Sequence, residues 1–293
     1  MRIHSRIIVL AGLLTLTVLS AYSSTLSVVF YDNRYGTLND ATGVYTNVGT
    51  LPISASAGDA SMGGLLYVEN MGSDLYTVDP NTGVSSLVGA TGLTTTSGAF
   101  AGDSYGLFEV DYLSNVYSIS PQTGQAELVG ATGLVANNGS FDTSLSAAGA
   151  YLYYTAGHAG APDELYAINM ATGIATDLGS TGVTGIAGSA IVGSELELFQ
   201  YGQSTNYIYS SPVGQDDFTR GAVLGAQIID GGASMAIAET TNTQQGNAPE
   251  PGSYFLIFAG ILAMALTSNG RRRIVCIVRR EVSLSRTARN LLP

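Results

Sequence analysis

The sequence Leu75-Tyr76-Thr77-Val78-Asp79-Pro80-Asn81-Thr82-Gly83 recurs in several copies along the chain, and this repeat determines the predicted fold. Its apolar residues alternate with period two, which predicts a strand with one buried face. A proline at the second turn position and a glycine in left-handed backbone suit a tight hairpin that carries a bulge. The stretch therefore predicts a strand, a turn and a return strand.

The copies have a nearly regular spacing. They lie at Leu38–Gly43, Val116–Gly124 and Leu165–Gly173, with a degraded copy at Tyr207–Gly214. The glycines that end the first four copies are 40, 41 and 49 residues apart, and that of the degraded copy lies 41 further on. A second strand precedes most copies, as at Leu65–Val68, and a small-residue segment such as Ala57–Ser61 precedes that strand. Three to four strands in a repeat of this length are typical of a β-propeller blade.

The two ends of the repeat region complement each other. The first copy has strands between Leu26 and Gly49 but no inner strand before them, whereas Gly232–Ala238 resembles an inner strand with no blade after it. If they join, they complete one blade and remove the open edges that invite aggregation. The sequence therefore predicts an all-β protein with a closed, five-bladed propeller over residues 24–239. An open array or a β-sandwich is the alternative.

Charge is distributed very unevenly. The chain has 11 basic residues, all arginine, and 22 acidic ones. Only Arg34 and Arg220 fall in residues 24–250, together with 21 acids, so this body has a net charge of 2 − 21 = −19. Such a surface repels nucleic acid, which we do not expect as a partner. The one cysteine, Cys276, lies outside the body, which therefore forms no disulfide.

The N-terminus has the layout of a secretory signal peptide, assigned to residues 1–23. Arg2 and Arg6 form a charged region, Ile7–Leu19 an apolar core, and Ser20–Ser23 offers small residues for cleavage. An uncleaved membrane anchor is the alternative, but the apolar core is short for a span of about 20 residues. We expect an N-terminal signal helix and export.

The C-terminal part contains Pro249-Glu250-Pro251, an apolar run from Tyr254 to Leu266, and Arg271-Arg272-Arg273. This order resembles the PEP-CTERM sorting signal of Gram-negative bacteria. The resemblance implies a membrane-sorting helix, transient insertion into the inner membrane, and cleavage by the protease exosortase. It also implies a place at the cell surface or in the extracellular matrix, with exopolysaccharide and biofilm. We assign residues 240–250 to a polar tether, 251–273 to the sorting signal and 274–293 to a basic tail, which extends further than is usual in this family.

Few residues offer catalytic chemistry. His158 is the one histidine of the body, and a lone loop histidine is more often solvated than a general base. Acidic pairs occur at Asp163-Glu164, Asp216-Asp217, Glu195 with Glu197, and Asp74 with Asp79. Loop carboxylates bind calcium, so Asp163, Glu164, Asp216 and Asp217 are the candidate calcium ligands. None of these pairs is a specific signal, because a body with 21 acids places some side by side by chance. Turn chemistry is the commoner role of such residues.

Two functions remain open from the sequence. The first is a non-catalytic surface or matrix protein whose acidic propeller binds or displays, with no cofactor other than calcium. The second is a secreted lyase or glycosidase that uses carboxylates at the mouth of the channel, for which Glu195 and Glu197 on one strand face are candidates. The scarcity of histidine, lysine and arginine favours the first.

Overall fold

The computed structural model describes residues 24–30, 32–53, 56–62, 65–70, 72–94, 99–135, 143–158, 161–225 and 235–239. Side chains are described for these residues except 56–61, 158 and 235–239. The chain divides into two units, Met1–Thr241 and Asn242–Pro293. The predicted signal peptide, tether, sorting signal and basic tail lie outside the described residues. No helix in the described ranges is long and apolar enough to cross a membrane.

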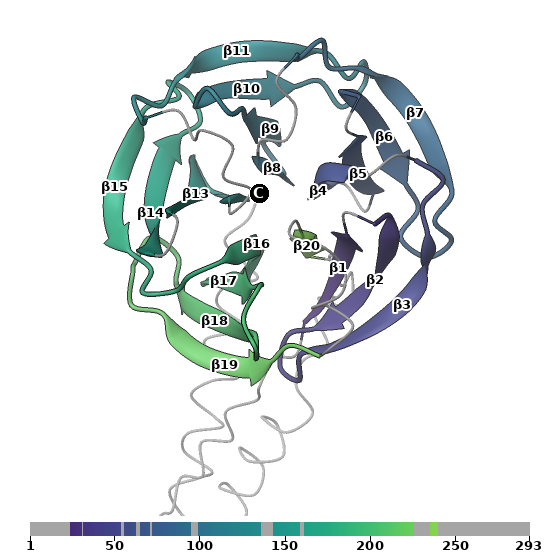
Figure 1. The fold of residues 1–293 in the computed structure, drawn as a ribbon. Helices are drawn as coiled ribbons and strands as arrows, with labels where there is room; N and C mark the ends of the chain where they lie inside the picture. Colours follow the sequence, from purple (N-terminus) through teal and green to yellow (C-terminus); the bar gives the residue numbers. More distant parts are fainter. Residues whose placement is uncertain are drawn as a thin grey trace, which may run out of the picture. The chain divides into compact units, whose positions relative to one another are not determined.

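The described residues form five four-stranded antiparallel sheets arranged as the blades of a propeller (Figure 1). Blade 1 consists of β20 (Met235–Glu239), β1 (Thr25–Phe30), β2 (Arg34–Asn39) and β3 (Val44–Thr50). Blade 2 consists of β4 (Ser56–Met62), β5 (Leu65–Asn70), β6 (Asp74–Val78) and β7 (Ser85–Ala90). Blade 3 consists of β8 (Ala99–Asp103), β9 (Gly106–Val110), β10 (Asn115–Ile119) and β11 (Ala126–Ala131). Blade 4 consists of β12 (Thr143–Ala148), β13 (Tyr151–His158), β14 (Ala161–Asn169) and β15 (Ala175–Ser180). Blade 5 consists of β16 (Ile186–Val192), β17 (Glu195–Gln200), β18 (Tyr207–Pro212) and β19 (Thr219–Val223).

The two ends of the propeller close the ring, as the sequence predicted. Strand β20 pairs antiparallel with β1, with Leu26 opposite Glu239 and Phe30 opposite Met235. The innermost strands β4, β8, β12, β16 and β20 contact one another in turn around the axis. The predicted inner strand at 232–238 is observed at Met235–Glu239. The predicted five-bladed ring is confirmed. Strand β20 covers the edge of β1 that would otherwise be open.

The repeated turn has the conformation that its residues predict. Gly43, Gly83, Gly124, Gly173 and Gly214 all have positive φ, between 67° and 84°. In four of these five turns, the residue that opens the turn carries a side-chain oxygen that accepts from the turn backbone; these residues are Asn39, Asp79, Ser120 and Asn169. Asp79 Oδ1 accepts from Asn81 N at 2.8 Å, and this hydrogen bond is the main cause that lowers the pKa of Asp79. This explains why Asp, Asn or Ser begins the turn.

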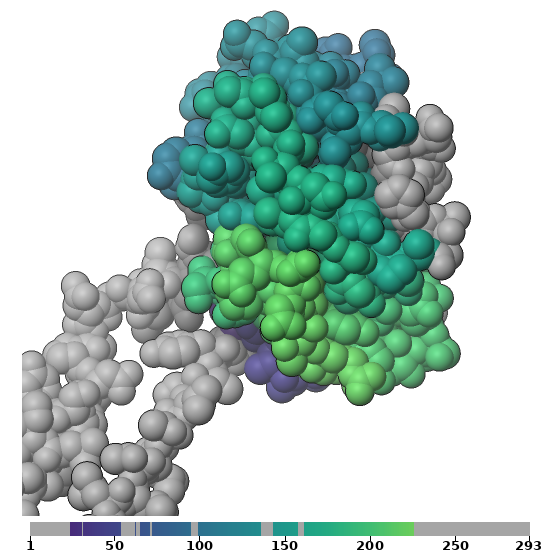
Figure 2. All heavy atoms as spheres, turned by 90° about the vertical axis from the view of Figure 1, so that its left-hand side faces the viewer, coloured from purple at the N-terminus to yellow at the C-terminus, as the bar shows by residue number. Residues whose placement is uncertain are grey.

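The hydrophobic core is divided into five clusters, one in each seam between neighbouring blades. The second strand of each blade has two buried faces because each face meets a different blade. In β1, Val28 packs towards blade 5 with Phe199, whereas Val29 packs towards blade 2 with Val68. Figure 2 shows the outer wall of the ring, where blade 5 (green) adjoins blade 4 (teal).

Glycines allow the blades to approach closely at the outer end of three seams, where Gly43, Gly124 and Gly173 meet the backbone of the preceding blade. The turn of one blade packs on the outer strand of the blade before it, as Gly124 does on Gly89 and Gly173 on Gly130. A Cβ added at Gly124 would lie 2.6 Å from the carbonyl oxygen of Gly89, closer than real Cβ atoms come. Backbone hydrogen bonds also connect neighbouring blades across the seam, for example from Ala126 N to Thr91 O at 3.1 Å. The repeat therefore holds glycine at these places for inter-blade packing as well as for turn geometry.

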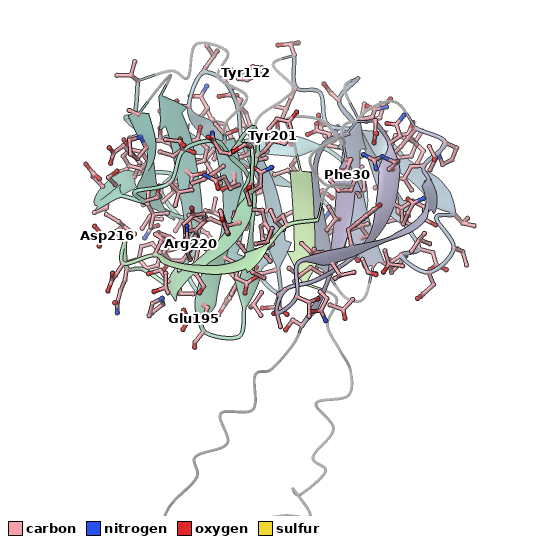
Figure 3. All side chains as sticks on the ribbon, turned by 60° about the horizontal axis from the view of Figure 1, so that its bottom comes forward. Phe30, Tyr112, Glu195, Tyr201, Asp216 and Arg220 are labelled. Atoms are coloured by element: carbon pink, nitrogen blue, oxygen red, sulfur yellow. The ribbon has the colours of Figure 1, made fainter. Side chains whose placement is uncertain are left out.

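The ring has two distinct faces. The turn face carries the hairpins that join the third to the fourth strand of each blade and, in blades 2 to 5, the first to the second strand. The loop face carries the other connections. Both described ends belong to the turn face, because Ser24 N donates to Asp40 Oδ1 in the β2–β3 turn and Leu26 pairs with Glu239. Figure 3 places Tyr112 and Tyr201 at the loop face and Glu195 near the turn face.

Candidate functional site

The predicted calcium ligands Asp163 and Glu164 lie on β14 and have different roles. The Asp163 side chain is buried, and its Oδ2 accepts from the backbone N of Ile186 at 3.0 Å, which ties blade 4 to the first strand of blade 5. Glu164 follows directly on the strand, so its side chain leaves from the opposite face and is half-buried. The two side chains therefore leave the strand in different directions.

The other predicted pair, Asp216 and Asp217, lies exposed between β18 and β19. Asp216 stands on the outside of blade 5 (Figure 3), where its carboxylate faces Gly179 of blade 4. Within the described residues, no group of three or more Asp, Glu, His or Cys side chains is placed to hold a metal ion. Calcium binding by these four acids stays a prediction for experiment.

The remaining sequence candidates are dispersed. Glu195 and Glu197 share one face of β17, as predicted from their spacing; Glu195 is half-buried and Glu197 is 9 % exposed. Asp74 and Asp79 do not form a pair, because they lie at opposite ends of β6. His158 ends β13, and its side chain is outside those described. The sorting residues Pro249, Glu250, Pro251, Arg271, Arg272 and Arg273 also lie outside the described part of the chain.

The most unusual site in the described structure is one that the sequence analysis missed. Glu69 on β5 and Glu109 on β9 are both completely buried, at 0 % exposure. Tyr67 and Leu75 of blade 2 and Phe100 and Leu107 of blade 3 form the apolar cluster of the same seam. Because side chains alternate along a strand, Glu69 shares the face of Tyr67 and Glu109 that of Leu107. The two carboxyl groups face each other across the seam and are within hydrogen-bonding reach.

The hydrogen bonding of this carboxyl pair is incomplete. Thr91 Oγ1 lies 3.1 Å from Glu69 Oε1 and also 3.1 Å from Ser73 O, so its single proton serves one of them at a time. Glu69 Oε2 and both carboxylate oxygens of Glu109 have no donor among the described residues. Buried polar atoms without a partner cost free energy, about 1–3 kcal/mol or more for charged groups. Each carboxyl group thus depends on the other.

The charge around the pair is negative. Burial raises the pKa of Glu69, while hydrogen bonds from Glu109 and Thr91 act in the opposite direction and Asp74 adds to the rise. Burial also raises the pKa of Glu109 well above its ordinary value, and the carboxylates of Glu69 and Asp111 raise it further. Full ionisation of both groups is therefore disfavoured at this place.

The four other seams provide an internal comparison. Strand pairing within the blades aligns Glu69 with Val110 and Glu109 with Val68. The equivalent positions of the other seams hold mainly apolar side chains, in the pairs Val29 and Val68, Val110 and Tyr154, Thr155 and Leu198, and Phe199 and Val28. The propeller thus does not need carboxyl groups at this level of the seam. The Glu69–Glu109 pair is a special feature of the seam between blades 2 and 3.

Comparison with known proteins identifies the architecture alone. No protein-family model matches the sequence, and a search of curated proteins finds no match either. Among solved structures, a chain in the crystal structure of a nidogen/laminin complex is similar, with a TM-score of 0.52 and 11 % sequence identity. The similarity covers 74 % of this chain and 99 % of the other. At this level of identity the comparison supports the five-bladed propeller fold.

Proposed function

We propose that this chain is an exported, non-catalytic protein of the cell surface or extracellular matrix, whose propeller acts as an acidic binding or display module. The observation that carries the proposal is the position of the two described ends. Ser24 and Glu239 leave the ring close together on the turn face. A propeller attached through a segment after Glu239 would present its loop face to the surroundings.

The comparison and the sequence support the same proposal. The similar chain comes from a complex of nidogen and laminin, so its fold occurs in a protein that is bound to another protein. The order of Pro249-Glu250-Pro251, the apolar run and Arg271-Arg272-Arg273 supports export through the inner membrane of a Gram-negative bacterium and processing by exosortase. Exopolysaccharide is the surface partner that this sorting signal implies. The net charge of −19 over residues 24–250 keeps such a module soluble.

Intact mass of the surface-extracted protein tests the sorting part of the proposal. In a Gram-negative host that contains exosortase, we expect a mature chain that lacks residues 1–23 and ends near Pro249–Pro251. A matched strain without the protease should retain Arg271–Pro293. Finding that tail in both strains, or finding the protein inside the cell, would overturn the proposal.

Two epitope insertions test the orientation. Gly202 lies in the loop face and Gly149 in the turn face, and both have positive φ with no atom within 4 Å of an added Cβ. They are therefore matched places for an inserted tag. On intact cells, we expect an antibody to label the tag at position 202 more strongly than the tag at 149, with equal labelling after extraction. Equal labelling on cells would contradict display of the loop face.

A further inference from the structure

We infer that Glu69 and Glu109 share one proton in the folded propeller and thereby make the seam between blades 2 and 3 a pH-sensitive latch. The proposal concerns the body of the protein and is independent of its export. It starts from geometry: two carboxyl groups at 0 % exposure face each other, and three of their four oxygens have no donor among the described residues. A proton on one carboxyl group gives the other a donor.

Among the residues that the structure describes, no positive charge acts on the pair to replace that proton. The acidic groups that act on the pair are Asp74 at the start of β6 and Asp111 after β9, and Tyr117 on β10 faces Asp111. The two arginines in the described part of the chain, Arg34 and Arg220, belong to blades 1 and 5. Two ionised carboxylates would repel each other inside an apolar seam, where water cannot screen them. One shared proton removes most of that repulsion and creates a hydrogen bond.

Both carboxylate oxygens of the neighbouring Asp111 already have hydrogen-bond partners. Its Oδ1 accepts from Asn115 N at 2.8 Å, and its Oδ2 lies 3.2 Å from Asn115 Nδ2 and 3.4 Å from the Tyr117 hydroxyl. It therefore remains an acceptor in the turn and adds negative charge near Glu109. This arrangement strengthens the tendency of the pair to keep its proton as the pH rises.

The direction of the pH effect follows from linkage. The folded protein holds a proton that the unfolded chain has lost above the ordinary pKa of glutamate. The stabilisation is therefore complete in acid and is lost as the pH rises towards the raised pKa of the folded pair. One proton changes the ratio of folded to unfolded protein by at most tenfold per pH unit, which corresponds to about 1.4 kcal/mol. The latch is closed in mildly acidic surroundings and weakened in alkaline ones.

The test is thermal and urea unfolding of the full chain between about pH 5 and 8.5, where surface carboxylates have finished titrating. In Glu109→Gln the amide donates to Glu69 at every pH, so we expect a flatter pH dependence than in the wild type. Glu127→Gln is the control, because Glu127 is an exposed glutamate of the same blade; its profile should run parallel to the wild type. Equal slopes for the wild type and Glu109→Gln would overturn the proposal.

Two further arms keep the test decisive. The variant Glu69→Val with Glu109→Val copies the Val29 and Val68 contact of the adjacent seam. If Glu109→Gln fails to fold, this double variant should fold and lack the pH slope; a slope equal to the wild type would overturn the proposal. In the second arm, calcium is compared with sodium at equal ionic strength and pH 8. A saturable calcium stabilisation that Glu109→Gln abolishes would show that the pair holds a cation, which also overturns the shared proton.

Discussion

Replacement of Gly124 by alanine tests how the blades are joined. Gly124 has φ +79°, and an added Cβ would lie 2.6 Å from the oxygen and 2.8 Å from the carbonyl carbon of Gly89. Gly133 has the same φ of +79° but no atom within 4 Å of its added Cβ. The two substitutions therefore share the backbone cost and differ in the contact between blades 2 and 3.

The magnitudes follow from these two terms. Left-handed backbone costs an alanine about 1–2 kcal/mol, which we expect for both Gly124→Ala and Gly133→Ala. Displacing the backbone of Gly89 adds about 1–3 kcal/mol for Gly124→Ala, the usual range for overpacking. At about 2–4 °C per kcal/mol for a domain of this size, Gly124→Ala should melt about 2–12 °C below Gly133→Ala.

Differential scanning calorimetry of the two full-length variants measures this gap, and urea midpoints provide an independent estimate. Far-UV circular dichroism before unfolding controls for retention of the β structure. Equal melting temperatures for the two variants would refute the inference that the Thr-Gly turn holds the seam by close backbone approach. The glycines would then serve turn geometry alone.

The remaining predictions concern closure and calcium. Deleting β20 (Met235–Glu239) removes the strand that pairs with β1, so soluble yield and melting temperature should both fall. A deletion of equal length within the predicted tether at 240–250 is the control and should change neither. A β20 deletion that is as soluble and stable as the parent would contradict the closed ring. For the predicted calcium ligands, melting curves in calcium are compared with ionic-strength-matched sodium, and a hundredfold excess over the dissociation constant would stabilise a true site by about 2.7 kcal/mol. The gain should disappear in Asp216→Asn with Asp217→Asn, and superimposable wild-type curves in the two salts would contradict the site.

The fold was largely predictable because each blade repeats the same local rules. Positive φ at Gly83 and its equivalents, the turn begun by Asp79, and the alternation of buried residues are properties of short stretches of sequence. Ring closure was predictable from what the two ends lacked. The sequence has no inner strand before Leu26, and it has a strand near 232–238 with no blade after it. In the structure, that strand lies at Met235–Glu239 and pairs with β1.

The carboxyl pair was not predictable from adjacent acids, because Glu69 and Glu109 are 40 residues apart and occupy different positions of the repeat. Glu69 aligns with Val110, whereas Glu109 aligns with Val68. Their positions in the repeat thus differ by one residue, so their side chains leave opposite faces of equivalent strands. Because opposite faces of neighbouring blades meet in each seam, the two carboxyl groups lie together. A search of the sequence for that offset would have found the pair, once the two faces of a blade strand were assigned to different neighbours.

The acidic candidates chosen from sequence show the converse geometry. Asp163 and Glu164 are adjacent in the chain, but strand geometry turns their side chains to different faces. Asp163 is used to fix Ile186 of the next blade. Residues adjacent on a strand direct their side chains to opposite faces, whereas residues on equivalent strands of neighbouring blades can meet in the seam between them. In a propeller, proximity in space therefore follows the repeat register more closely than distance along the sequence.

The acid-rich body affects how the latch is to be measured. The ordinary pKa values of Asp and Glu side chains in model peptides lie near 4, so acid-dependent repulsion is sampled mainly below about pH 5. Above that range, the slope of stability against pH comes from groups whose pKa is raised, such as Glu69, Glu109 and Asp103. Burial is the main cause that raises the pKa of Asp103 as well. Asp103 is unchanged in Glu109→Gln, and its contribution cancels when the variant profile is subtracted from the wild type. The difference profile should approach one proton at its steepest point, and a difference near zero would assign the alkaline weakening to Asp103 instead.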